Sequence, residues 1–93
     1  MERNDKMKVG IVMGSKSDYP VVERAEKVLT DFGVEFETRI ISAHRTPVAA
    51  MEFASKAEEN GIEVIIAAAG KAAHLGGVLA AFTPMPVIGL PVK

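Results

Sequence analysis

Six consecutive residues, Ser42 to Pro47, bring together two hydroxyls, an imidazole and a guanidinium. The imidazole of His44, with an unperturbed pKa of about 6.5, suits proton transfer near neutral pH. Arg45 beside a helix N-terminus can clamp a phosphate or a carboxylate, because its planar fork adds to the free backbone N–H groups. The same segment also fits a plain capped turn, with Thr46 as N-cap and Pro47 in the first helical turn. On these residues alone both interpretations stay open.

Two other segments carry polar groups among small residues, Gly14–Asp18 and Gly70–Gly77. The serine hydroxyls and backbone donors of the first segment suit a phosphate, although its spacing matches neither a Walker loop nor a dinucleotide-binding fingerprint. Asp18 could accept hydrogen bonds from ribose hydroxyls, or it could cap the helix that follows. His74 in the second segment could be a core histidine or a group close to a ligand. Lys16 is interpreted as a solvated charge.

Apolar runs of two kinds must position these segments. Short runs rich in β-branched residues predict buried strands, and runs with apolar residues three and four apart predict helices. Gly33 and Asn60-Gly61 are typical helix stops. The expected strands are Val9–Met13, Val34–Ile41, Val64–Ala69 and Val87–Leu90, and the expected helices are Pro20–Phe32, Pro47–Asn60 and Val78–Phe82.

The alternation of strands and helices predicts an α/β fold: a three-layer, flavodoxin-like open parallel sheet with strand order 2-1-3-4. We expect residues 1–7 to form a solvated tail and residues 8–93 to form a single domain. In such a sheet ligands bind beyond the carboxyl ends of the strands, where the strand order reverses. Both histidines of the chain lie in segments that should meet there, which is the strongest indication of a site.

Composition excludes several classes of function. A net charge of −1 gives no electrostatic footprint for nucleic acid, and no apolar run reaches transmembrane length. The chain has no cysteine, so the cytoplasm is the default location. Two histidines without a nearby cysteine or carboxylate partner argue against a metal site.

Taken together, the segments resemble one family, the PurE family. The motifs that carry the resemblance are GSKSD, SAHRTP, AAAGKAAHLGG and PMPVIGLPVK, and the match runs from Val9 to Lys93. These proteins are the N5-carboxyaminoimidazole ribonucleotide mutases of purine biosynthesis. Two kinds of departure occur in the third motif: Ala68 and Lys71 stand where the family usually has glycine, and Gly76 stands where it usually has proline.

The resemblance implies an isomerase that moves a carboxylate from the exocyclic N5 of a ribonucleotide to ring carbon C4 without ATP, biotin or a metal. One general acid/base is enough for this chemistry. The residues that match the family's motifs divide into that catalytic group and a set of substrate contacts. The resemblance implies His44 as general acid/base, Ser15, Ser42 and Arg45 at the 5′-phosphate, Asp18 at the ribose hydroxyls, and His74 at the base and CO2 pocket.

Two other functions remain open beside this one. Related class II enzymes carboxylate the aminoimidazole ribonucleotide directly with free CO2, although the sequence AAHL favours the mutase class. The chain could also be a non-catalytic nucleotide-binding or assembly module. Family members are typically octamers with a further strand and helices after the equivalent of Lys93. A sheet that ends with the apolar strand Val87–Leu90 predicts an unstable, inactive chain or a homo-oligomer in which neighbours cover that strand.

Overall fold

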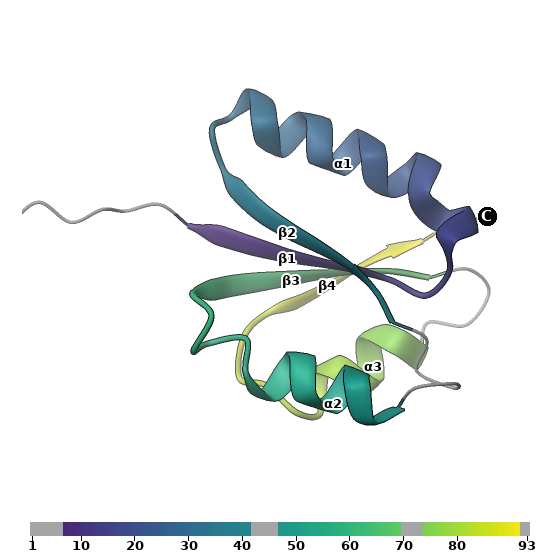
Figure 1. The fold of residues 1–93 in the computed structure, drawn as a ribbon, viewed down its shortest axis with the longest axis vertical. Helices are drawn as coiled ribbons and strands as arrows, with labels where there is room; N and C mark the ends of the chain where they lie inside the picture. Colours follow the sequence, from purple (N-terminus) through teal and green to yellow (C-terminus); the bar gives the residue numbers. More distant parts are fainter. Residues whose placement is uncertain (1–6, 42–46, 70–73, 92–93) are drawn as a thin grey trace, which may run out of the picture.

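A computed structural model describes residues 7–41, 47–69 and 74–91 of the chain. Strands and helices alternate along these residues, as Figure 1 shows. The strands are β1 (Lys8–Met13), β2 (Glu35–Ile40), β3 (Ile62–Ala69) and β4 (Val87–Pro91). The helices are α1 (Tyr19–Asp31), α2 (Pro47–Ser55) and α3 (His74–Ala80), and a 3-10 turn, η1 (Lys16–Asp18), precedes α1.

The strands form one sheet in the order β2-β1-β3-β4, and each neighbouring pair is parallel. Helix α1 covers one face of this sheet, and α2 and α3 lie on the other (Figure 1). This arrangement confirms the predicted three-layer flavodoxin-like fold and its strand order. The expected division into a tail at residues 1–7 and a domain at 8–93 stays a prediction, because most of that tail lies outside the described residues.

The core is divided by the sheet into two apolar clusters. β1 contributes to both, since Val12 is buried on the α2 and α3 side and Ile11 on the α1 side. Apart from those two residues, the α2 and α3 side holds Ile41, Ala50, Phe53, Ala54, Ala57, Ile62, Ile65, Ala67, Leu75 and Leu79, and the α1 side holds the smaller set Val9, Met13, Val22 and Ala68. Ala50, Phe53 and Ala54 of α2 are therefore buried, whereas Val48 of the same helix is 60% exposed.

Helix α1 ends where the sequence predicts. Gly33 has a φ of 71°, and the N–H of Val34 donates to the carbonyl of Leu29 at 2.8 Å, which closes the last turn. The apolar residues of this helix are only partly buried: Val28 is 52% exposed, and Phe32, which directly follows the helix, is 77% exposed. Val22 and Leu29 mark the side of the helix that faces the sheet. At 100° per residue, Val28 and Phe32 are rotated away from that side.

Two helix boundaries differ from the prediction. α2 ends at Ser55 instead of Asn60, and turns lead to Gly61, whose φ of 81° reverses the chain before β3. α3 begins at His74 instead of Val78, so part of the expected loop Gly70–Gly77 is helical. Glycines at 76 and 77 disfavour a helix locally, but Leu75 and Leu79, one turn apart, are both buried in the core. Tertiary packing therefore overrides local propensity.

Candidate functional site

The carboxyl ends of β1, β2 and β3 are level, and they form one edge of the sheet. Met13 at the end of β1 is paired with Ile40 on β2 and with Ala68 on β3. Two hydrogen bonds extend this alignment: the N–H of Ile41 donates to the carbonyl of Met13 at 2.8 Å, and the N–H of Gly14 donates to the carbonyl of Ala68 at 3.2 Å. The three polar segments predicted to meet therefore leave the sheet from one edge, beside the reversal of strand order.

The first of these segments, Gly14–Asp18, is held by its own hydrogen bonds. The N–H of Ser15 donates to Oδ2 of Asp18 at 3.1 Å, and the N–H of Ser17 donates to Oγ of Ser15 at 3.2 Å. These two bonds form a capping box around η1. The segment thus has a fixed shape before any ligand binds.

The Asp18 carboxylate makes no capping hydrogen bond to α1, the helix that follows, and instead accepts from the N–H of Ser15 in the box around η1. It is the one charged side chain among the described residues that is classed as buried, at 7% exposed, and it lies at the N-terminus of α1. None of the described residues donates a hydrogen bond to its second oxygen, Oδ1. One oxygen of this carboxylate thus holds the loop.

The hydroxyl of Ser15 lies at the surface of this segment, 3.0 Å from the hydroxyl of Ser17. Either hydroxyl can donate to the other. Because a hydroxyl proton rotates, each can instead donate to an incoming anion. Ser17 was not among the predicted site residues. Its place between Ser15 and Asp18 in a loop before a helix was the signal that could have indicated it.

The remaining predicted site residues are less fully placed. Ser42, His44 and Arg45 lie outside the described residues, so their expected roles stay predictions. His74 is the first residue of α3, the helix that follows the end of β3 at Ala69.

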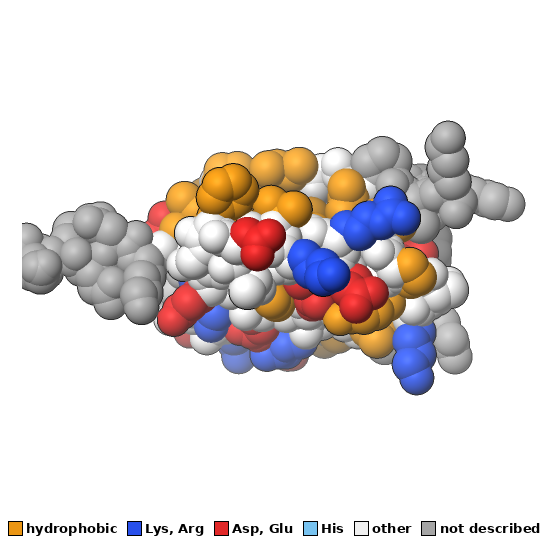
Figure 2. Space-filling view, turned by 90° about the horizontal axis from the view of Figure 1, so that it is seen from above, with side chains coloured by type: hydrophobic (Ala, Val, Ile, Leu, Met, Phe, Trp, Pro, Cys, Tyr) orange, Lys and Arg blue, Asp and Glu red, His pale blue; other side chains and the backbone are white. Residues whose placement is uncertain are grey.

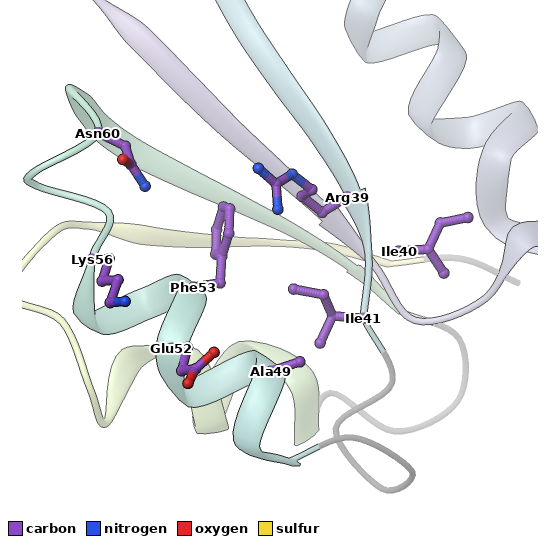
Figure 3. A pocket seen from close by; sticks show the side chains of 8 residues that line it. All are labelled: Arg39, Ile40, Ile41, Ala49, Glu52, Phe53, Lys56 and Asn60. Atoms are coloured by element: carbon purple, nitrogen blue, oxygen red, sulfur yellow. The ribbon is translucent and has the colours of Figure 1, made fainter.

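A groove of about 370 Å³ lies between β2 and α2, and none of its lining residues is a predicted site residue. In Figure 3 Arg39 of β2 and Phe53 of α2 face each other there, with the guanidinium carbon 5.9 Å from the ring centre. This contact is a cation–π interaction. The groove is lined by Arg39, Ile40, Ile41, Ala49, Glu52, Phe53, Lys56 and Asn60.

The Glu37 carboxylate on β2 is paired with a lysine on β1 and with an arginine on its own strand. Lys8 Nζ lies 3.1 Å from Oε1 of Glu37, and the guanidinium of Arg39 contacts Oε2 of the same carboxylate. The hydrogen bond from Lys8 lowers the pKa of Glu37 below its usual value; burial opposes this shift, and the charge of Arg39 adds to it.

Within residues 7–41, 47–69 and 74–91 no three histidine, cysteine or carboxylate side chains gather as a metal site would need. In the same part of the chain no helix is both long enough and apolar enough to cross a membrane.

The chain is similar in sequence to a known protein family and to named proteins. The sequence profile of the family described as AIR carboxylase matches residues 8–93. A protein of Pyrococcus abyssi named N5-carboxyaminoimidazole ribonucleotide mutase is 65% identical over 86 residues, which are 92% of this chain and 49% of that protein. A protein of Pyrococcus horikoshii with the same name is 59% identical over 98% of this chain and 51% of its own length.

A differently named relative and a solved structure add to these matches. The phosphoribosylaminoimidazole carboxylase of Saccharomyces cerevisiae is 60% identical over 91% of this chain and 15% of that protein. The crystal structure of Treponema denticola PurE superposes with a TM-score of 0.87 at 30% identity, over 95% of this chain and 56% of that one. The chain therefore spans about half the length of the mutases it matches.

Proposed function

Because the chain belongs to the AIR carboxylase family, we propose that it carries the substrate-binding edge of an N5-carboxyaminoimidazole ribonucleotide mutase of purine biosynthesis. The observation that carries this proposal is the level edge of β1, β2 and β3, from which all three motif segments depart. The names of the mutases that are 59% and 65% identical support the choice of reaction. Activity of this chain is itself part of the proposal, since those relatives are about twice as long.

The proposed reaction needs one group that gives a proton and later takes one. Protonation of N5 lets the N–CO2 bond break, and the bonding electrons stay on nitrogen as CO2 leaves. Ring carbon C4 then attacks the retained CO2, and the C4 proton is removed. We assign both proton transfers to His44, because an imidazole can act as acid and then as base near neutral pH.

Binding of the distant phosphate would orient the base and ribose for this step. We assign the phosphate to Ser15, Ser42 and Arg45, and the ribose hydroxyls to Asp18. The fixed shape of the first segment supports this assignment, because a preformed loop loses little freedom when a ligand binds. We assign His74 to the base and CO2 pocket, with no metal and no cofactor.

A second candidate is direct carboxylation of the aminoimidazole ribonucleotide by free CO2. The carboxylase name of the 60% identical Saccharomyces cerevisiae relative is the observation that favours it. The two reactions share a product and differ in the source of the carboxyl group. They can therefore be separated by their dependence on bicarbonate.

We further propose a cytoplasmic homo-oligomer, an octamer by family resemblance. Large hydrophobic side chains on several elements are exposed, among them Phe32 at 77%, Val48 at 60% and Ile88 at 53%. Figure 2 looks onto the face that α1 covers, and hydrophobic side chains gather along one of its long edges there. Contacts between copies would remove such side chains from water.

The test is to incubate the chain with N5-carboxyaminoimidazole ribonucleotide and follow the 4-carboxylated product, with and without added bicarbonate. The mutase proposal predicts product without bicarbonate. Product that forms from the aminoimidazole ribonucleotide, and only with bicarbonate, would favour the carboxylase. Ribonucleotide binding without product would favour a non-catalytic nucleotide-binding module, and an absence of both would favour an assembly module.

A further inference from the structure

A single carboxylate links α1 to β2 outside the three polar segments. The phenol of Tyr19 donates to Oε1 of Glu26 at 2.7 Å, and the hydroxyl of Thr38 donates to Oε2 at 2.6 Å. Both oxygens of Glu26 are therefore used, one by each donor. Such hydrogen bonds to a charged acceptor are stronger than bonds between neutral groups.

The two donors lie close to the candidate site along the chain. Tyr19 is the first residue of α1 and follows Asp18 directly, so its position is tied to the capped segment Gly14–Asp18. Thr38 lies on β2, opposite Ile11 in the sheet, and β2 ends at Ile40 just before the second segment. Glu26 thus connects the element after the first segment with the strand before the second.

Apolar packing holds α1 through the buried Val22 and the partly buried Leu29. Val22 is the one residue of this helix classed as buried, and the apolar cluster beneath it is the smaller of the two. A groove of about 340 Å³ runs beside the contact, lined by Tyr19, Glu26 and Phe36 among others. Directional bonds add to this apolar packing in setting how the helix lies against β2.

We propose that Glu26 is a positioning residue: by holding Tyr19 and Thr38 together, it sets the placement of Ser15 and Asp18 relative to β2. The substrate consequence rests on the function proposed above, whereas the effect on the first segment does not. The raised pKa of the Tyr19 phenol agrees with the contact, since its first cause is the hydrogen bond to Glu26, followed by burial and by the charges of Glu26 and Glu23.

The chain offers a spectroscopic reporter for this contact. It has one tyrosine and no tryptophan, so the ultraviolet absorbance change of tyrosinate reports Tyr19 alone. We expect Glu26→Gln to lower the pKa of Tyr19 toward its ordinary value more than Glu23→Gln does. Glu23 lies one turn away on the same helix and contributes charge without a hydrogen bond. Equal changes in the two variants would contradict a specific contact.

Amide hydrogen exchange tests positioning without any ligand. In Glu26→Ala we expect the amides of Ser15, Ser17 and Asp18 to exchange about tenfold faster, while amides of β1 and β3 keep their rates. Glu26→Gln should lie between, because an amide oxygen still accepts one bond. Glu23→Ala is the matched control. Unchanged exchange in both Glu26 variants overturns the proposal, and so does equal acceleration throughout the chain, which would indicate general destabilisation.

Ribose 5-phosphate is the probe for the substrate consequence. If the wild-type chain binds it, Glu26→Ala should weaken binding by about tenfold and Glu23→Ala should leave binding unchanged. Equal affinities for wild type and Glu26→Ala would overturn a role in ligand positioning. A wild-type chain that binds no ribose 5-phosphate would count against the proposed function, while the exchange rates would still decide whether Glu26 holds the first segment.

Discussion

The two edge strands of the sheet, β2 and β4, expose different side chains. β2 carries Glu35, Glu37 and Arg39, and its central carboxylate is paired with Lys8 and Arg39. β4 reads Val-Ile-Gly-Leu-Pro and carries no charge. Charges along an edge oppose pairing with another chain, and an apolar edge favours it.

We propose different roles for these two edge strands. The residues after β2 include His44 and Arg45. The edge strand whose charges oppose pairing with another chain is therefore the one that leads to the proposed catalytic residues. β4, the edge strand without charges, lies at the opposite side of the sheet. Contact with other copies there would leave the carboxyl ends of β1, β2 and β3 open to a ligand. We therefore expect substitutions near β2 to change turnover and binding, and substitutions on β4 to change association.

The largest effect should follow from His44→Asn. Asparagine keeps the size and hydrogen bonding of the side chain but has no titratable proton, so turnover of N5-carboxyaminoimidazole ribonucleotide should fall by about 10²–10⁴-fold. Ribonucleotide affinity, thermal unfolding and sedimentation should stay as in the wild type. A variant that keeps more than about a tenth of the rate would assign the acid–base role to another group.

Arg45→Lys should have the next largest effect. Lysine keeps the charge and loses the bidentate fork, so calorimetry should show about a tenfold loss of affinity for the ribonucleotide. The matched ligand is the phosphate-free nucleoside, whose affinity should change far less. Equal losses for both ligands would indicate that Arg45 does not contact the phosphate.

Two isoleucines test the comparison of the edges directly. Ile40 on β2 and Ile88 on β4 are each 53% exposed. Ile88→Lys should weaken self-association, measured by sedimentation equilibrium, by up to about tenfold, because a charge would replace apolar surface at the interface. Ile40→Lys is the matched control and should change association little. The reverse ranking would mean that β2, and not β4, is the assembly edge.

The smallest effect concerns the ion pairs of β2. The pKa of Glu37 is lowered in the folded state, so its contribution to stability is present above the unfolded-state pKa and is lost as pH falls through the folded-state pKa. Lys8→Met should therefore flatten the acid side of the curve of unfolding free energy against pH, by less than about 1 kcal/mol. Lys27→Met on the exposed surface of α1 is the control, and an identical curve for both variants would assign no stabilising role to the Lys8 contact.

The sequence predicted the order and type of the elements well, because the hydrophobic periodicity and the helix-stop residues were clear. Runs such as Val9–Met13 are buried on both faces of a parallel sheet, and Gly33 stops α1 as expected. The start of α3 was missed because Gly76 and Gly77 look like a loop, whereas burial of Leu75 and Leu79 decides the matter. That packing depends on residues distant in the chain, so local pattern could not reveal it.

The candidate site was predictable to a different degree. Parallel topology brings the ends of β1, β2 and β3 to one end of the sheet, so it could be predicted without knowing any side-chain position that the three segments leave the sheet there. The contacts of Glu26 could not be predicted, since they depend on how α1 lies across β2. The roles of His44, Arg45 and Ser42 stay predictions.

One measurement tests the central claim most directly: a nuclear magnetic resonance titration of the isotopically labelled chain with 4-carboxy-5-aminoimidazole ribonucleotide. We predict that the largest saturable shifts occur in the amides of Ser15–Asp18, of residues 42–46 and of His74, at the common edge of β1, β2 and β3. The amides of β4 should not respond. Largest shifts in the groove beside Arg39 and Phe53, or no saturable shift at all, would contradict the proposal that this edge binds the ribonucleotide.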